Sequence, residues 1–109
     1  MATHHANPGE IVDLQSWADD LPKEQTKAIV KTDEIELIRI VLRSGKEIPN
    51  HKVAGPITVQ CVAGKILFTA MGATQELKYD QLLHLMPGEP DSLKAIEDSV
   101  ILLTIIFKN

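Results

Sequence analysis

Residues 45–64, GKEIPNHKVAGPITVQCVAG, place a histidine and a β-forming run between two glycines. The run ITVQCV, residues 57–62, is rich in β-branched side chains and favours a strand. Glycine-containing turn formers flank this run, and His51 falls in the turn region that precedes it. The turn at 63–65 favours a hairpin that pairs the run with the next apolar segment, residues 66–70. This stretch therefore predicts a domain of short β-strands.

The alternation of short strands and turns continues on both sides of this stretch. Residues 34–43, EIELIRIVLR, are apolar on both faces, which indicates a strand buried between two layers. Many short strands without a convincing long helix favour a sandwich or a barrel. The remaining strand candidates are short and separated by turn residues: 27–31, 76–79, 81–86, 92–96 and 100–107.

Residues 1–26 differ from the rest of the chain because isolated apolar residues alternate with turn formers. We expect an N-terminal arm with one helical turn near 16–19, and Trp17 packed on the barrel or on a partner subunit. Residues 27–109 then form the barrel domain. The last candidate strand, VILLTIIF at 100–107, is apolar on both faces. Its outer face needs cover, either from the arm or from a second copy of the chain.

The spacing from Gly45 to Gly64 resembles the first cupin motif, Gly-x5-His-x-His-x3-Glu-x6-Gly, with His51 at the first histidine. The second motif, Gly-x5-Pro-x-Gly-x2-His-x3-Asn, fits in length from Asp80 to Ala95, with Gly88 at its second glycine. The resemblance extends over residues 34–107. It implies an all-β fold, a cupin-type double-stranded β-helix (jelly-roll barrel) with an N-terminal arm.

Most metal-ligand positions of the family carry other residues in this chain. Metal-binding cupins present three histidines and one glutamate, but Val53 and Ile57 stand at the second histidine and the glutamate. Asp91 stands at the last histidine, so His51 and Asp91 remain. Two protein ligands hold a metal weakly, and catalytic sites normally use three. The resemblance therefore implies at most a divalent transition metal on His51 and Asp91, not a full cupin metal centre.

Two other residues provide an alternative ligand set. Cys61 has the correct parity to point inward, and His84 lies on the strand before the Pro-Gly turn. With His51 and Asp91 they would suit zinc. The competing interpretation makes Cys61 a small core residue, His84 a surface or hydrogen-bonded strand residue, and Asp91 a turn cap.

Alternation along a strand predicts the lining of the barrel, because residues of equal parity share a face. The chain is expected to bind a small organic ligand in an apolar pocket, with His51 and Asp91 as polar contacts and no assigned catalytic residue. The alternative is a metal-dependent enzyme of dioxygenase or isomerase type that uses His51 in an unconventional ligand set. The predicted pocket consists of His51, Val53, Ile57, Val59, Cys61 and Asp91.

The composition of the chain limits the binding partners and the cellular location that we expect. The chain has 109 residues, 44% of them hydrophobic, which fits one globular domain. A net charge of −4 argues against nucleic acid and anionic membranes. Cys61 is the only cysteine and the first residues lack signal-peptide features, so a cytoplasmic location is expected. Cupins are commonly dimers, and the resemblance implies a symmetric homodimer.

Overall fold

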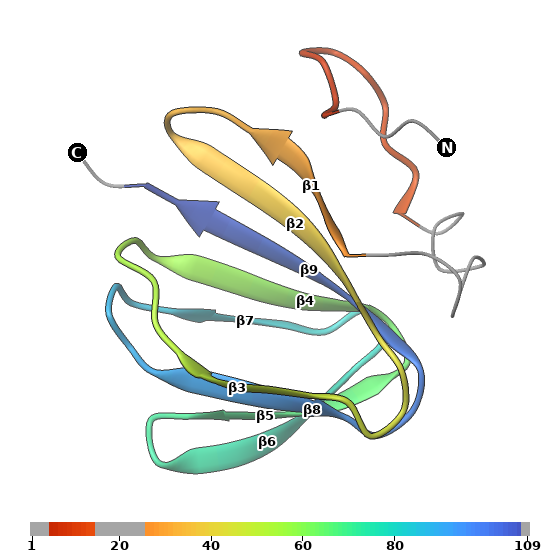
Figure 1. Cartoon of the computed structure of the whole chain (residues 1–109), viewed down its shortest axis with the longest axis vertical. Helices are drawn as coiled ribbons and strands as arrows, with labels where there is room; N and C mark the ends of the chain where they lie inside the picture. Colours follow the sequence, from red (N-terminus) through yellow and green to blue (C-terminus); the bar gives the residue numbers. More distant parts are fainter. Residues whose placement is uncertain (1–4, 15–25, 108–109) are drawn as a thin grey trace.

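The computed structural model describes residues 5–14 and 26–107, apart from the side chains of Asn50 and His51. Within these residues the chain forms two antiparallel sheets (Figure 1). The predicted all-β fold is therefore confirmed. The strands are β1 (Lys27–Lys31), β2 (Ile35–Leu42), β3 (Glu47–His51), β4 (Ile57–Ala63), β5 (Lys65–Ala70), β6 (Ala73–Lys78), β7 (Leu82–Leu85), β8 (Asp91–Ala95) and β9 (Ser99–Ile106).

The chain passes repeatedly between the two sheets. One sheet has the order β1-β2-β9-β4-β7, and the other has the order β3-β8-β5-β6. The connections from β2 to β3, from β4 to β5 and from β7 to β8 each change sheet. This arrangement confirms the predicted jelly-roll barrel, because strands distant in sequence become neighbours, while of the sequential strands only β1 with β2 and β5 with β6 pair in the same sheet.

The predicted hairpin between 57–62 and 66–70 is wrong. β4 pairs with β7 and β9, whereas β5 pairs with β6 and β8. Gly64 connects β4 to β5 with a φ of +83°, and a Cβ there would lie 2.3 Å from the carbonyl oxygen of Asp98. Glycine is needed because the chain changes sheet in a left-handed conformation against a neighbouring turn.

β3 contains His51, which the sequence pattern had placed in a turn region. β3 is an edge strand that pairs with β8 alone, and its register shifts between Ile48 and His51. Pro49 lies within this shift. A proline has no N–H to donate, so edge strands and irregular positions are where a sheet accepts it.

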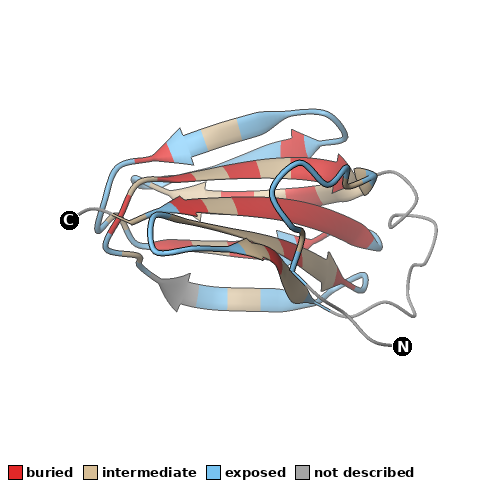
Figure 2. Cartoon of the chain, turned by 90° about the horizontal axis from the view of Figure 1, so that it is seen from above, coloured by how far each residue is buried: buried red, intermediate tan, exposed pale blue. Residues whose placement is uncertain are grey.

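Side chains of alternate residues form two hydrophobic clusters on opposite faces of the five-stranded sheet. On β9, Ile101 and Leu103 point into the core between the sheets, whereas Val100 and Leu102 belong to a second, outer cluster. Residues of the N-terminal arm pack against the outer cluster: Ala6, Val12 and Leu14. Figure 2 shows that buried residues concentrate in the central strands. Trp17 and the helical turn expected at 16–19 lie outside the described residues.

The barrel has two ends, which are at the right and the left of Figure 1. The Gly64 end contains the connections β2–β3, β4–β5, β6–β7 and β8–β9. The Asp91 end contains the connections β1–β2, β3–β4, β5–β6 and β7–β8. At the Gly64 end, the buried Ser99 hydroxyl accepts the N–H of Lys65 at 3.0 Å and donates to the carbonyl of Glu97 at 2.7 Å.

Candidate functional site

Asp91 is a buried carboxylic acid at the Asp91 end, with only 3% of its surface exposed. In the sheet it lies opposite His51 on β3 and opposite Ala70 on β5. Ala70 in turn pairs with Ala73 on β6. The two polar residues of the predicted pocket are therefore direct neighbours across two strands, although the His51 side chain lies outside the described part of the chain.

In the five-stranded sheet, a row of paired residues lies at the same end of the barrel as Asp91. Ile57 is opposite Leu85 on one side and Ile105 on the other, and all three are buried. Ile105 is opposite Glu36 on β2, whose carboxylate forms an ion pair with Lys31 at 3.4 Å. The inner surface at the Asp91 end thus combines apolar side chains with the carboxylates of Asp91 and Glu36.

Sequence reasoning missed Glu36. The pattern that assigned Ile38, Ile40 and Leu42 to one face of β2 also assigns Glu36 to that face, two residues earlier. Three of these residues pack in or against the core between the sheets: Ile38, Ile40 and Leu42. The alternation was therefore sufficient to identify Glu36 as an inward-facing acid.

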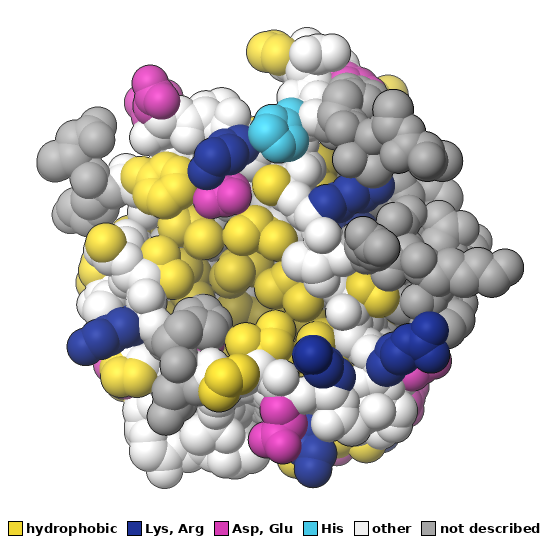
Figure 3. Space-filling model, viewed as in Figure 1, with side chains coloured by type: hydrophobic (Ala, Val, Ile, Leu, Met, Phe, Trp, Pro, Cys, Tyr) yellow, Lys and Arg dark blue, Asp and Glu magenta, His cyan; other side chains and the backbone are white. Residues whose placement is uncertain are grey.

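The apolar residues of the predicted pocket lie on the inner face of the barrel. Ile57, Val59 and Cys61 belong to the core cluster, and Val53 packs against it. Figure 3 shows hydrophobic side chains gathered in a hollow over β9, β4 and β7, with charged side chains around it. The carbonyl of Val53 accepts the N–H of Gly88 at 2.8 Å, so two loops at the Asp91 end are tied together.

Cys61 is fully buried near the Gly64 end, away from the level of Asp91. Its N–H and carbonyl bond Gln81 and Asp80 in the β6–β7 connection, and its thiol donates to the carbonyl of Ala63 at 3.4 Å. Desolvation by burial raises the pKa of the thiol to about 11. A neutral thiol bonded to the main chain is a structural core residue rather than a metal ligand or a nucleophile.

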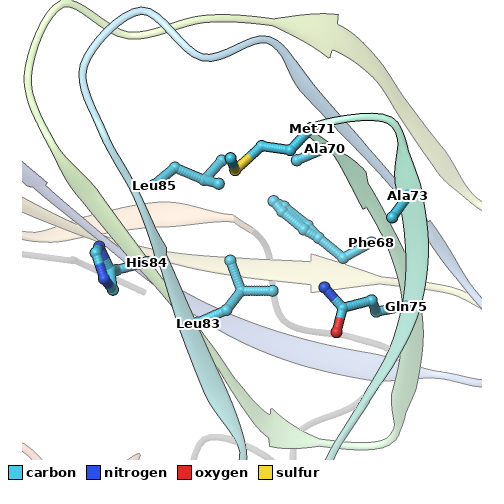
Figure 4. A pocket seen from close by; sticks show the side chains of 8 residues that line it. All are labelled: Phe68, Ala70, Met71, Ala73, Gln75, Leu83, His84 and Leu85. Atoms are coloured by element: carbon cyan, nitrogen blue, oxygen red, sulfur yellow. The ribbon is translucent and has the colours of Figure 1, made fainter.

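His84 is exposed on β7 and points away from the barrel interior, whereas Leu83 and Leu85 point inward (Figure 4). The structure therefore does not bring Cys61 and His84 together with Asp91. Among the described residues, no group of three or more His, Cys, Asp and Glu side chains could hold a metal ion. Val53 and Ile57 have no donor atoms, so these residues do not fit a three-ligand catalytic metal site.

A separate cavity of about 150 Å³ lies between the β5–β6 hairpin and β7 (Figure 4). Its walls are apolar apart from the Gln75 amide and the rim residue His84. None of the residues of the predicted pocket lines it. The lining residues are Phe68, Ala70, Met71, Ala73, Gln75, Leu83, His84 and Leu85.

Solved structures share this architecture at low sequence identity. A conserved protein of unknown function from Streptococcus pyogenes matches 100% of this chain and 97% of its own, with 19% identity and a TM-score of 0.80. A cupin superfamily protein from Desulfitobacterium hafniense covers 84% of this chain and 87% of its own, with 10% identity and a TM-score of 0.77. A salicylate 1,2-dioxygenase from Pseudaminobacter salicylatoxidans covers 67% of this chain but 21% of its own, with 19% identity and a TM-score of 0.64.

These likenesses show that the chain has the cupin fold, as its motif spacing predicted. Neither a protein-family model nor a curated protein sequence matches the chain. No helix in the described residues is long and apolar enough to cross a membrane.

Proposed function

We propose that this cupin-fold protein binds a small, mostly apolar organic molecule at the Asp91 end of its barrel, without a full metal site. The observation that carries the proposal is the burial of the Asp91 carboxyl beside an apolar inner surface. Burial of an ionisable group costs free energy, and such groups concentrate where proteins bind or react. Apolar pockets with a few convergent polar groups are the usual form of small-molecule sites.

Each residue has a distinct role in this proposal. Asp91 accepts a hydrogen bond from a donor group of the ligand, and His51, its neighbour on β3, supplies the second polar contact. Val53 and Ile57 form apolar walls, because both lie on the inner face at the same end. Val59 and Cys61 follow on β4 toward the Gly64 end and form the floor of the pocket.

Nile red, a neutral dye that fluoresces in apolar surroundings, tests the pocket. The wild-type protein is expected to enhance its fluorescence saturably. Val53→Glu is expected to weaken binding at least tenfold, because it places a charge on the apolar wall. Ala54→Glu is the matched control, since Ala54 is exposed and adjacent, and should bind as the wild type does. Equal binding by the two variants, or none by the wild type, contradicts the proposal.

The second candidate is a metal-dependent enzyme of dioxygenase or isomerase type that uses His51. One observation favours this metal-dependent enzyme: the register of β3 and β8 places His51 directly opposite Asp91. Metal analysis of protein purified without chelator, repeated on His51→Ala, separates the two functions. Stoichiometric metal that disappears in the variant favours the enzyme. No metal, and no affinity for iron, zinc, nickel or manganese, favours the binding protein.

We further propose that the chain is a symmetric homodimer in the cytoplasm. Exposed apolar residues support self-association, among them Leu82 on the edge strand β7 and Ile106 on β9. Sedimentation at micromolar concentration should give the mass of two chains. A single monomeric species at that concentration refutes the homodimer.

A further inference from the structure

The turn between β5 and β6 contains a residue in an unfavourable backbone conformation. Met71 and Gly72 join the paired residues Ala70 and Ala73, with φ angles of +54° and +78°. Two positive φ values in a two-residue hairpin loop are typical of a type I′ turn, which prefers Asn-Gly or Asp-Gly. Asp80 also has a positive φ, but aspartate tolerates this conformation, whereas methionine rarely adopts it.

The Met71 side chain gains little from folding, because the residue is 75% exposed. It extends over the cavity between the hairpin and β7, toward Leu85 (Figure 4). Strained residues persist where the surrounding structure or the function requires them. A flexible thioether side chain is suited to cover a cavity of this kind.

The size and lining of the cavity define what it accepts. The cavity is half open to solvent, and its volume of about 150 Å³ has room for one benzene-sized ring. Phe68, Leu83 and Leu85 supply an aromatic ring and aliphatic walls, which favour an aromatic guest. The Gln75 side chain extends into the same space and supplies one donor and one acceptor.

We propose that this cavity binds a single aromatic ring carrying one hydrogen-bonding substituent, as in a phenol, and that Met71 covers the ring. None of the residues assigned to the pocket proposed above lines this cavity, although Ala70 lies opposite Asp91 and Leu85 lies opposite Ile57 in the sheets. Gln75 selects the polar substituent, and Met71 limits the size of the guest.

Phenol and toluene are the probes, followed through the alanine methyl resonances of the protein. Phenol is expected to shift the Ala70 and Ala73 methyls saturably, with a Kd on the order of 1 mM, as suits so small a ligand. The methyl of Ala28 on β1 should not move. Phenol should bind at least threefold more tightly than toluene, and Gln75→Leu should abolish that preference.

Met71→Asn separates the two effects of Met71. Asparagine suits the type I′ turn, so the variant is expected to unfold at a higher temperature than the wild type. The same change removes the cover and is expected to weaken phenol binding at least fivefold. Met86→Asn is the control, because Met86 is 68% exposed and does not line the cavity. It should change neither property.

Several outcomes overturn the inference. An absence of saturable shifts at Ala70 and Ala73 in the wild type removes the site. Unchanged phenol affinity in Met71→Asn removes the role of Met71, and Met71→Ala decides the same point if the asparagine variant does not fold. Phenol binding that survives in Val53→Glu separates this site from the pocket tested with Nile red.

Discussion

The two ends of the barrel use their polar side chains differently. At the Gly64 end, polar side chains hold the main chain, as Ser99 bonds Lys65 and Glu97 and the Asp98 carboxylate accepts the N–H of Ser44 at 2.8 Å. At the Asp91 end, main-chain bonds tie the loops, including Gly88 to Val53 and Ile106 to Pro56, and the exposed Thr32 hydroxyl accepts the N–H of Glu34. Among the described residues, the buried polar side chain at this end is Asp91, which lies beside the apolar inner surface. Ser99 thus stabilises the fold at the Gly64 end, whereas the buried Asp91 favours the other end as the place for ligand chemistry.

Gly64→Ala should destabilise the Gly64 end and give the largest effect of the substitutions considered below. The new Cβ would lie 2.3 Å from both the Asp98 carbonyl and the Ser99 hydroxyl, at a φ of +83°. We expect a loss of at least about 3 kcal/mol in the free energy of unfolding, or no folding. Gly72 has a similar φ, but a Cβ there would have nothing within 4 Å. Urea denaturation should therefore show that Gly72→Ala lowers the free energy of unfolding by only about 1 kcal/mol. Equal losses in the two variants would contradict the packing argument.

High pH should weaken the Gly64 end through Cys61. Burial raises the pKa of this thiol from 9.0 to about 11, so the unfolded chain loses its proton first. The contribution of Cys61 to stability is complete below pH 9 and is lost as the pH rises through 11, by roughly 2 to 3 kcal/mol. Urea denaturation between pH 7.5 and 10.5 checks this against Cys61→Val, which should lose less stability. Parallel pH curves for the two proteins would refute the assignment.

Single substitutions at Ser99 and Asp91 test whether the buried polar side chains of the two ends differ in their contribution to stability. Ser99→Ala deprives the N–H of Lys65 of its buried acceptor and should cost about 2 kcal/mol. Asp91→Asn keeps the shape of the side chain and one acceptor oxygen, so we expect a smaller change, within about 1 kcal/mol. Calorimetric unfolding of both variants is the measurement. A larger loss in Asp91→Asn than in Ser99→Ala would assign Asp91 to the fold.

The smallest effect is expected at Glu36. Its ion pair with Lys31 involves a half-exposed lysine, so Glu36→Gln should change stability by less than about 1 kcal/mol. Thermal unfolding at low and high salt measures this, and the wild type should lose the small difference when salt is added. A salt-independent loss above that size would show that Glu36 supports the Asp91 end structurally.

Strands with strong patterns could be predicted from the sequence, and weakly patterned ones could not. The runs at 34–43 and 100–107 are apolar on both faces and predicted the strands β2 and β9. That these two strands pair along their whole length is seen only in the structure. β3 reads EIPNH and has one apolar side chain suited to a strand, so its strand conformation depends on pairing with β8. The hairpin at Gly64 was wrongly predicted because a turn sequence does not determine which of the two sheets the next strand joins.

The sequence predicted which side chains of the candidate site point into the barrel. It did not predict how far each lies from either end of the barrel. Alternation correctly gave the inner face for Ile57, Val59 and Cys61. It could not show that Cys61 lies near the Gly64 end while Asp91 lies at the other. The alternation of residues along a strand determines which face of the sheet a side chain lies on. Its position between the two ends of the barrel depends on the register between strands that are distant in sequence. The cavity beneath Met71 could not be predicted from the sequence for the same reason, since β5, β6 and β7 meet there only in the folded barrel.

The position of β9 has a consequence for biosynthesis. β9 is the last of the described strands to leave the ribosome, yet it lies between β2 and β4 at the centre of its sheet. Until residues 99–106 emerge, β2 and β4 have apolar surfaces and unpaired edges, which are prone to aggregation. Pairing Ile35 with Ile106 also closes a long loop, which slows folding. The nascent chain therefore cannot complete this sheet during translation of β1–β8.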